Sequence, residues 1–97
     1  MLERDFQGDF VKAIERRIPG CKVVKNDPSN NQGFPDLTVF YKEKYAVIEA
    51  KRSEDAKYRP NQEDYIKIFG LYTFAKRAEP ENEEEILNGL SDFFGIQ

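Results

Sequence analysis

The sequence predicts an α/β fold with its elements in the order α-β-β-β-α-β-α. Apolar residues recur at helical spacing near both ends of the chain, which predicts helices there. Two stretches in the middle are rich in β-branched and aromatic residues, which favours strands. The 97 residues suffice for one modest core, and we therefore expect a single domain over residues 1–97.

The amino-terminal third predicts a helix, a strand and a loop. The helix covers residues 2–18, and its apolar side consists of Leu2, Phe6, Phe10, Ala13, Ile14 and Ile18. Pro19 and Gly20 end this helix. Residues 21–26 follow as a short strand, and the polar stretch 27–33 is typical of a turn-rich loop.

The central part predicts a strand pair and a second helix. The strands cover residues 36–41 and 44–50, and a charged turn at Lys42 and Glu43 joins them. Asn61 is a suitable N-cap for a helix that runs to Phe69. Gly70 follows directly and ends that helix.

The carboxyl-terminal part is open to two interpretations. Residues 71–76 predict a fourth strand, although a single long helix over 61–78 is also compatible with the pattern. Pro80 begins a last helix, whose apolar side consists of Ile86, Leu87, Leu90, Phe93 and Phe94. The acidic stretch 81–85 suits the first turn of that helix, because negative charge interacts favourably with the helix dipole there.

The composition excludes several kinds of catalyst. The chain has no histidine, which excludes Ser-His-Asp hydrolases and imidazole-bound zinc. Its single cysteine, Cys21, excludes an internal disulfide and a zinc finger, and its setting beside valines is typical of a small core residue. No apolar run is long enough to cross a membrane and no secretory signal is visible, so we expect a cytoplasmic protein.

Charge is distributed unevenly along the chain. Residues 1–77 hold all 15 Lys and Arg against 12 Asp and Glu, a net charge of +3. Residues 78–97 hold six acids and no base, a net charge of −6. The body of the chain is therefore basic enough to meet a polyanion, although the total charge is −3.

Three charged residues are predicted to meet at one end of the strand pair. Glu49 and Lys51 are two positions apart on one strand, so both side chains point to the same face. A tight turn at residues 42–43 pairs position 36 with position 49, which places Asp36 beside Glu49. Two carboxylates this close repel each other unless a positive charge lies between them.

A hard divalent cation supplies that positive charge. Mg²⁺ suits a site of one or two carboxylates completed by water and phosphate, and the carbonyl of Ala50 is a further candidate ligand. A bound metal acidifies a water and stabilises charge on a phosphate. Lys51 is placed to orient or deprotonate that water. The residues themselves therefore predict metal-dependent hydrolysis of a phosphate ester.

The same residues match a known signature. Phe34-Pro35-Asp36 followed by Glu49-Ala50-Lys51 resembles the motif of PD-(D/E)XK nucleases. The segments 33–37 and 48–51, with the later Gln62, are most similar to the VRR-NUC branch, which is related to Holliday-junction resolvases. The resemblance spans roughly residues 3 to 76. It implies a restriction-endonuclease-like core, in which a central mixed four-stranded sheet is flanked by helices.

The resemblance also implies roles for individual residues. Asp36 and Glu49 would hold Mg²⁺ or Mn²⁺, and an acid on the first helix would complete the site. Glu3 fits that acid best by its spacing, and Glu15 is the rival on the same helix. Gln62 would contact Lys51, the phosphate or the metal shell. The activity implied is a metal-dependent endodeoxyribonuclease that selects junction or flap DNA.

Further residues are candidates for binding DNA beside the reacting phosphate. Flanking phosphates are expected to contact Arg52, Lys57, Arg59 and Lys67. Tyr58 and Tyr65 are candidates for packing on a sugar or a base. The small size of the domain favours a homodimer on two-fold branched DNA, and it would suit a phage or mobile element.

Two other functions remain open at this point. A non-catalytic nucleic-acid-binding or assembly module could retain the same fold, with Glu49 and Lys51 forming a mere ion pair. A metal-free protein-interaction domain could act through its acidic carboxyl-terminal stretch. If the protein is such an interaction domain, Asp36→Ala should change neither metal binding nor DNA processing.

Overall fold

The structure is a computed structural model that describes residues 1–96. Its helices and strands are α1 (Glu3–Arg17), β1 (Lys22–Lys25), β2 (Leu37–Tyr41), β3 (Lys44–Ala50), α2 (Gln62–Phe69), β4 (Phe74–Ala78) and α3 (Glu83–Phe94). Two short 3-10 turns, η1 (Pro28–Asn30) and η2 (Pro80–Asn82), lie in the connections. This is the α/β order that the sequence predicts. Gln97, the last residue of the predicted domain, lies outside the described residues.

The four strands form one mixed sheet in the order β1-β2-β3-β4. β2 pairs antiparallel with both β1 and β3, whereas β4 pairs with β3 in parallel. The parallel pairing requires a crossover from β3 to β4, and α2 forms part of it. The expectation of a central mixed four-stranded sheet is therefore confirmed.

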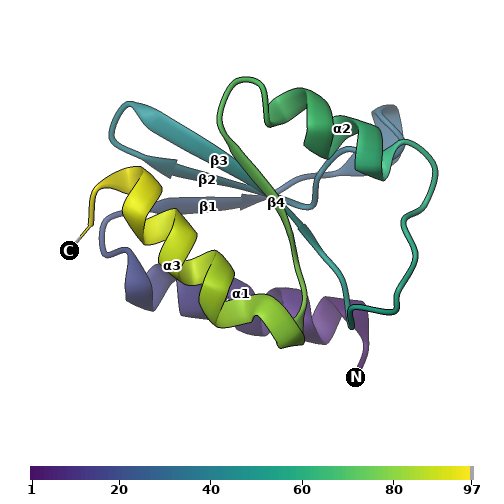
Figure 1. The fold of residues 1–97 in the computed structure, drawn as a ribbon, viewed down its shortest axis with the longest axis horizontal. Helices are drawn as coiled ribbons and strands as arrows, with labels where there is room; N and C mark the ends of the chain where they lie inside the picture. Colours follow the sequence, from purple (N-terminus) through teal and green to yellow (C-terminus); the bar gives the residue numbers. More distant parts are fainter. Residues whose placement is uncertain (97) are drawn as a thin grey trace.

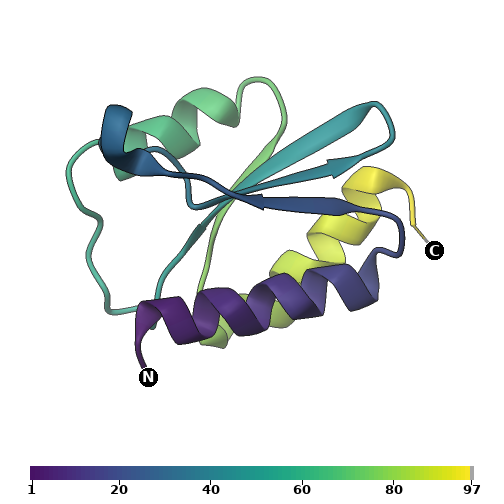
Figure 2. The same cartoon turned by 180° about the vertical axis from the view of Figure 1, so that it is seen from behind.

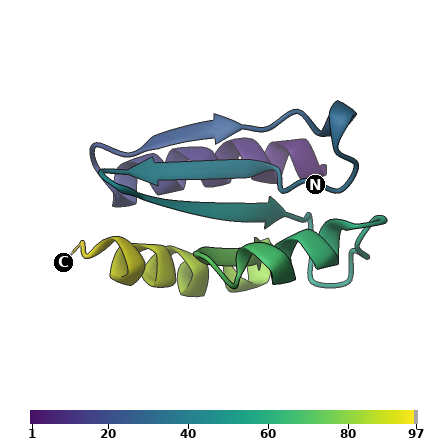
Figure 3. The same cartoon turned by 90° about the horizontal axis from the view of Figure 1, so that it is seen from above.

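Helices cover both faces of the sheet. α1 and α3 lie side by side on one face, whereas α2 lies on the opposite face (Figures 1 and 2). Seen from above, α2 lies over β4 (Figure 3). Across residues 1–96, no helix combines the length and the apolar character that crossing a membrane requires.

The main core fills the space between the sheet and the α1–α3 layer. Phe6, Phe10 and Ile14 of α1 are buried there against Leu37 and Ile48 of the sheet. Each side chain of this size stabilises the fold by about 1.5–3 kcal/mol when it is fully buried. Residues of β3 alternate between the two faces, so the odd-numbered positions face the α2 side.

The second face of the sheet has an aromatic cluster beneath α2. The ring of Phe34 meets Tyr65 and Phe69 of α2 edge-on, with ring centres 5.4 and 5.6 Å apart. Because helices cover both faces, β3 is buried over five consecutive residues, from Ala46 to Ala50. A charged side chain on this strand is therefore removed from water whichever face it points to.

The hairpin between β2 and β3 has the predicted register. Tyr41 pairs with Lys44, so the turn consists of Lys42 and Glu43 alone. Lys42 adopts a left-handed conformation, with φ of 53°, which allows the tight reversal. The pairing of Leu37 with Ile48 then places position 36 next to position 49.

The fourth strand lies later in the chain than predicted. The sequence favoured residues 71–76, but β4 covers Phe74–Ala78, and the alternative of one long helix over 61–78 is wrong. The reason is a turn after Gly70, in which the N–H groups of Leu71 and Tyr72 donate to carbonyls of α2. Leu71 is 81% exposed, so the turn leaves an apolar residue in solvent that the sequence pattern had assigned to a strand.

Two helix starts and one helix cap differ from the prediction. Leu2 precedes α1 and is 54% exposed, so it does not join the apolar side of that helix. Residues 80–82 form a 3-10 turn, and α3 begins only at Glu83. Asn61 occupies the N-cap position of α2 but makes no capping bond with its side chain, because its backbone is left-handed with φ of 71°. Its Nδ2 donates instead to the carbonyl of Gln32.

Candidate active site

The β2–β3 hairpin brings Asp36 and Glu49 together. Asp36 directly precedes β2, and the register places it opposite Glu49 of β3. The Asp36 Oδ2 accepts a hydrogen bond of 2.9 Å from the backbone N–H of Ala50. This bond fixes one carboxylate oxygen of Asp36 on the strand that carries Glu49, so the two acids share one site as the sequence predicts.

Asn26 holds the chain segment that leads into Asp36. Its Nδ2 donates to the carbonyl of Pro35 over 3.0 Å and to the hydroxyl of Thr38 over 2.8 Å. Its backbone N–H donates to the carbonyl of Asp36 over 2.7 Å. Asn26 is therefore a supporting residue of the site that sequence reasoning missed, because no local pattern links it to positions 35–38.

Glu49 is buried, with 1% of its surface exposed. Its Oε2 accepts a 2.9 Å hydrogen bond from Nε2 of Gln62, whereas Oε1 has no hydrogen-bond partner among the described residues. Burial raises the pKa of the Glu49 carboxyl from 4.5 to about 8, and the neighbouring charge of Asp36 adds to the rise. The raised pKa favours the protonated acid, which can hydrogen-bond to the Asp36 side chain, whereas a cation near Oε1 would favour the ionised form.

Lys51 is buried among acids, with 1% of its surface exposed. Its Nζ lies 3.9 Å from Oε2 of Glu49 and 3.7 Å from Oε1 of Glu3. Its backbone N–H donates to the carbonyl of Ala78, which extends the pairing of β3 with β4 by one residue. A single ammonium thus lies next to two carboxylates, and Asp36 brings a third acid to the same end of the sheet.

Asp36 and Glu3 lie in different surroundings. Burial raises the pKa of the Asp36 carboxyl, although the hydrogen bond from Ala50 acts in the opposite direction. Glu3 comes from the first turn of α1, and its side chain is 37% exposed. Of the two candidate acids on α1, Glu3 reaches the site, whereas Glu15 is exposed near Cys21.

Gln62 is fixed in one orientation. Its Oε1 accepts a 2.6 Å hydrogen bond from the backbone N–H of Arg59, so its Nε2 faces Glu49. The contact that Gln62 forms is with Glu49, and its expected contacts with Lys51, the phosphate or the metal shell stay predictions. Gln62 therefore holds Glu49 in place and leaves the other oxygen of that carboxylate free.

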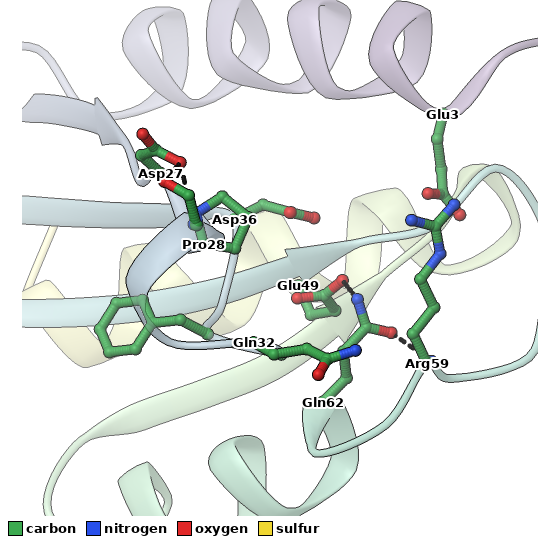
Figure 4. A pocket seen from close by; sticks show the side chains of 11 residues that line it. Glu3, Asp27, Pro28, Gln32, Asp36, Glu49, Arg59 and Gln62 are labelled. Carbon is green, nitrogen blue, oxygen red and sulfur yellow. Dashed lines mark hydrogen bonds between the residues drawn. The ribbon is translucent and has the colours of Figure 1, made fainter.

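A cavity of about 320 Å³ opens over these acids (Figure 4). It is lined by Glu3, Asp27, Pro28, Ser29, Gln32, Gly33, Phe34, Asp36, Glu49, Arg59 and Gln62. Figure 4 shows the side chains of Glu3 and Arg59 reaching the cavity from different elements, Glu3 from α1 and Arg59 from the segment before α2. The cavity thus has acids at its base and a cation at its edge.

Two loops form the walls of the cavity and touch at Gly33. Gly33 has φ of +90°, and a Cβ added there would lie 2.6 Å from the carbonyl oxygen of Pro60. The Nδ2 of Asn61 donates to the carbonyl of Gln32 in the same contact. Only glycine allows this close approach, so the position of the 27–33 loop depends on the segment that leads into α2.

The predicted phosphate-binding residues fall into two groups. Arg59 lines the cavity, and Arg52 and Lys57 are exposed on the same connection between β3 and α2. Lys67 does not join them, because it lies on α2 and forms an i,i+4 ion pair of 3.9 Å with Glu63. The residue of α2 that lines the cavity is its first, Gln62, and Lys67 lies further along the helix, away from the cavity.

Both predicted tyrosines pack against other side chains of the protein and are partly exposed. The ring of Tyr58 lies 4.9 Å from the guanidinium carbon of Arg77. Tyr65 packs against Phe34 and Phe69 in the aromatic cluster under α2. Both rings therefore take part in packing within the protein, and their contact with DNA stays a prediction.

The donor set fits a cation that needs few protein ligands. Within residues 1–96, no group of three His, Cys, Asp or Glu side chains is arranged to hold a metal. Asp36 and Glu49 make a pair, and Mg²⁺ is commonly held by one or two carboxylates plus water and phosphate. The buried, unpartnered Oε1 of Glu49 is the observation that fits such an ion. The Ala50 carbonyl as an additional ligand stays a prediction.

Comparison with known proteins gives no independent support for a family. No model of a protein family matches the chain, and no curated protein matches it either. The resemblance to PD-(D/E)XK nucleases therefore rests on the motif residues themselves.

Proposed function

We propose that the chain is a metal-dependent nuclease of the PD-(D/E)XK type, with a restriction-endonuclease-like fold. The observation that carries the proposal is the buried Glu49, whose Oε1 is unpartnered and which lies beside Asp36 and Lys51. A buried carboxylate oxygen that accepts no hydrogen bond is costly to a fold, so an acid kept at this position supports a ligand that binds Oε1.

The order of elements supports the same class. Asp36 directly precedes the second strand of an α-β-β-β-α-β arrangement, Glu49 lies on the third strand, and Lys51 directly follows it. The candidate acid Glu3 lies on the first helix. Gln62 begins the helix that follows. This arrangement supports the proposed class.

The residues divide the chemistry between them. Asp36 and Glu49 would hold Mg²⁺ or Mn²⁺, which when bound acidifies a water and neutralises charge on the phosphate. Lys51 orients the attacking water or stabilises negative charge on the phosphate oxygens. Gln62 keeps Glu49 turned toward the cavity, and Glu3 balances the charge of Lys51.

The substrate and the assembly are further parts of the proposal. The exposed cations of the 52–59 connection, together with Arg59 at the cavity, suit a phosphate backbone. A chain of 97 residues has little surface with which to hold a duplex, so we propose a homodimer acting on branched DNA, such as a junction or a flap.

The test is cleavage of labelled DNA by the wild type and by Asp36→Asn. The panel contains single strands, duplexes, flaps and four-way junctions, each with Mg²⁺, Mn²⁺ or EDTA. Asparagine keeps the volume of Asp36 and can still accept the hydrogen bond from Ala50, so the variant should fold. We expect cutting that requires the metal and falls in the variant by more than the roughly 10–100-fold typical of outer-shell changes.

Asp9→Asn is the matched control, because Asp9 is exposed on α1 outside the cavity. It should cut like the wild type. If the wild type binds DNA but cuts nothing under any condition, the nuclease proposal is wrong and a nucleic-acid-binding module replaces it. If it neither cuts nor binds, the nuclease proposal is also wrong, and a protein-interaction domain that acts through the acids of α3 replaces it.

A further inference from the structure

The connection between β3 and α2 has no regular structure over residues 51–61, yet it must place several residues of the site. Lys51 lies at its start, Arg59 near its end, and Gln62 directly follows it. Such a segment needs contacts outside itself to hold one conformation, because it lacks the hydrogen bonds of a helix or a sheet.

Arg77 of β4 supplies these contacts. Its Nη2 donates to three carbonyls of the connection, those of Ser53 at 3.0 Å, Glu54 at 3.2 Å and Ala56 at 2.5 Å. The face of its guanidinium lies over the ring of Tyr58, at 4.9 Å from the ring centre. One side chain thus binds four of the six residues from 53 to 58.

Arg77 is itself held firmly. Its Nε donates to Oε2 of Glu79 over 2.8 Å, in an ion pair whose two side chains are only 16% and 11% exposed. Asn82 fixes the same corner, because its Nδ2 donates to the carbonyl of Arg77 and its Oδ1 accepts from the N–H of Glu79. The guanidinium is therefore held in one position on β4, the strand that pairs directly with β3.

The contacts continue from Arg77 to the acids. Arg59 lies near the end of the connection that Arg77 holds, and its backbone N–H fixes the amide of Gln62. Gln62 in turn fixes Oε2 of Glu49. We propose that Arg77 is a positioning residue, which sets the cation affinity of the Asp36–Glu49 pair by holding the 52–59 connection in place.

This role rests on the proposed nuclease function, but it concerns a residue outside the signature. It also requires arginine in particular. A planar guanidinium carries its N–H donors in fixed directions, so Nε can bind Glu79 while the two hydrogens of Nη2 are shared among the three carbonyls and the plane stacks on a ring. A lysine at position 77 would keep the charge and lose most of these contacts.

The experiment compares the wild type with Arg77→Gln and, as a matched control, Arg16→Gln on the exposed side of α1. Hydrogen exchange reports the order of residues 52–59, and calorimetric titration with Mn²⁺ reports cation affinity, both well below the unfolding temperature. We expect Arg77→Gln to lose exchange protection in the connection and to weaken Mn²⁺ binding by about tenfold, the scale of a lost outer-shell partner. The control should change neither.

Two outcomes would overturn the proposal, and they are distinguishable. If the wild type binds Mn²⁺ and a folded Arg77→Gln binds it equally well, Arg77 is a structural residue only, whatever its effect on thermal stability. If the wild type binds no Mn²⁺, the proposed nuclease function fails and this role fails with it. Should Arg77→Gln not fold, Tyr58→Leu removes the ring under the guanidinium and leaves β4 intact, and it must shift both readouts in the same direction.

Discussion

Gln62 donates a hydrogen bond from its Nε2 to Oε2 of Glu49, and at 2.9 Å this bond joins two buried side chains that are 13 positions apart. The same amide accepts from the N–H of Arg59. Gln62 therefore connects the strand that carries the acids with the connection that forms the edge of the cavity. Changes at this position should affect both stability and cation binding.

Gln62→Leu should destabilise the fold by about 1–3 kcal/mol, because it removes the hydrogen-bond partner of the buried Glu49 Oε2 and of the partly buried N–H of Arg59. It should also weaken Mn²⁺ binding by about tenfold, since Glu49 would no longer be held. Urea unfolding and Mn²⁺ titration measure the two effects. A variant that loses stability but keeps the wild-type Mn²⁺ affinity would show that Gln62 has no part in holding a cation site.

Stability without a divalent cation should fall as the pH rises from about 4.5 to about 8. The pKa of Glu49 is about 8 in the folded chain against an ordinary value of 4.5. In that window the folded state binds more protons than the unfolded state, so raising the pH favours unfolding. The raised pKa of Asp36 acts in the same direction.

The measurement is the thermal midpoint at pH 5, 6, 7 and 8, with EDTA and with Mn²⁺. With EDTA the midpoint should decrease across the series, and Mn²⁺ should restore it most at high pH, where the carboxylates are free to bind. Glu49→Gln should remove much of the pH dependence. A midpoint that rises with pH in EDTA would contradict the burial-driven pKa of Glu49.

Gly33→Ala should destabilise the fold and reduce cutting together. The added Cβ would lie 2.6 Å from the Pro60 carbonyl, and the backbone would have to keep φ of +90° with a side chain present. Backbone strain of this kind costs on the order of 1–3 kcal/mol. Moving either loop to relieve it would change the walls of the cavity.

Gly8→Ala is the matched control for that substitution. Gly8 lies inside α1, and a Cβ there would meet nothing within 4 Å. Alanine should therefore stabilise the helix by roughly 0.5–1 kcal/mol and leave cutting unchanged. Chemical denaturation and the junction-cleavage assay compare the two variants. Equal effects of both on cutting would mean that the contact at Gly33 does not shape the cavity.

The local part of this architecture can be derived from the sequence. A two-residue turn at Lys42 and Glu43 fixes the register of the hairpin, and the period of two along a strand then places Asp36, Glu49 and Lys51 together. Apolar spacing gives the helices. These features depend on neighbours within about a dozen residues, which is why the pattern is sufficient.

The remaining features depend on contacts between distant segments. β4 begins at Phe74 because it pairs with Ala46 of β3, and the hydroxyl of Thr73 donates to the carbonyl of Tyr45 just before it. Asn61 is left-handed because it packs against the loop at Gly33. No sequence pattern near Phe74 or Asn61 predicts that these residues contact Ala46 and Gly33.

The roles of the supporting residues of the site could not be predicted from the sequence for the same reason. Asn26 and Arg77 act through carbonyl groups, and any residue type supplies a carbonyl. Their roles become visible only when the backbone is placed. The signature residues, in contrast, act through side chains whose chemistry the sequence shows directly.

Glu3 and Glu15 give the most direct test of the site, because they lie on the same helix and only Glu3 reaches Lys51. Glu3→Gln should slow metal-dependent cutting by about tenfold, since Lys51 would lose one of its two acidic partners and the third acid would be gone. Its effect on stability should stay within about 0.2–1 kcal/mol, because the carboxylate is partly in solvent. Glu15→Gln should alter neither quantity. Initial cleavage rates and thermal midpoints, measured side by side, separate the two variants. If Glu15→Gln slows cutting as much as Glu3→Gln, then the acid on α1 acts through the charge of the whole helix and not through its contact with Lys51.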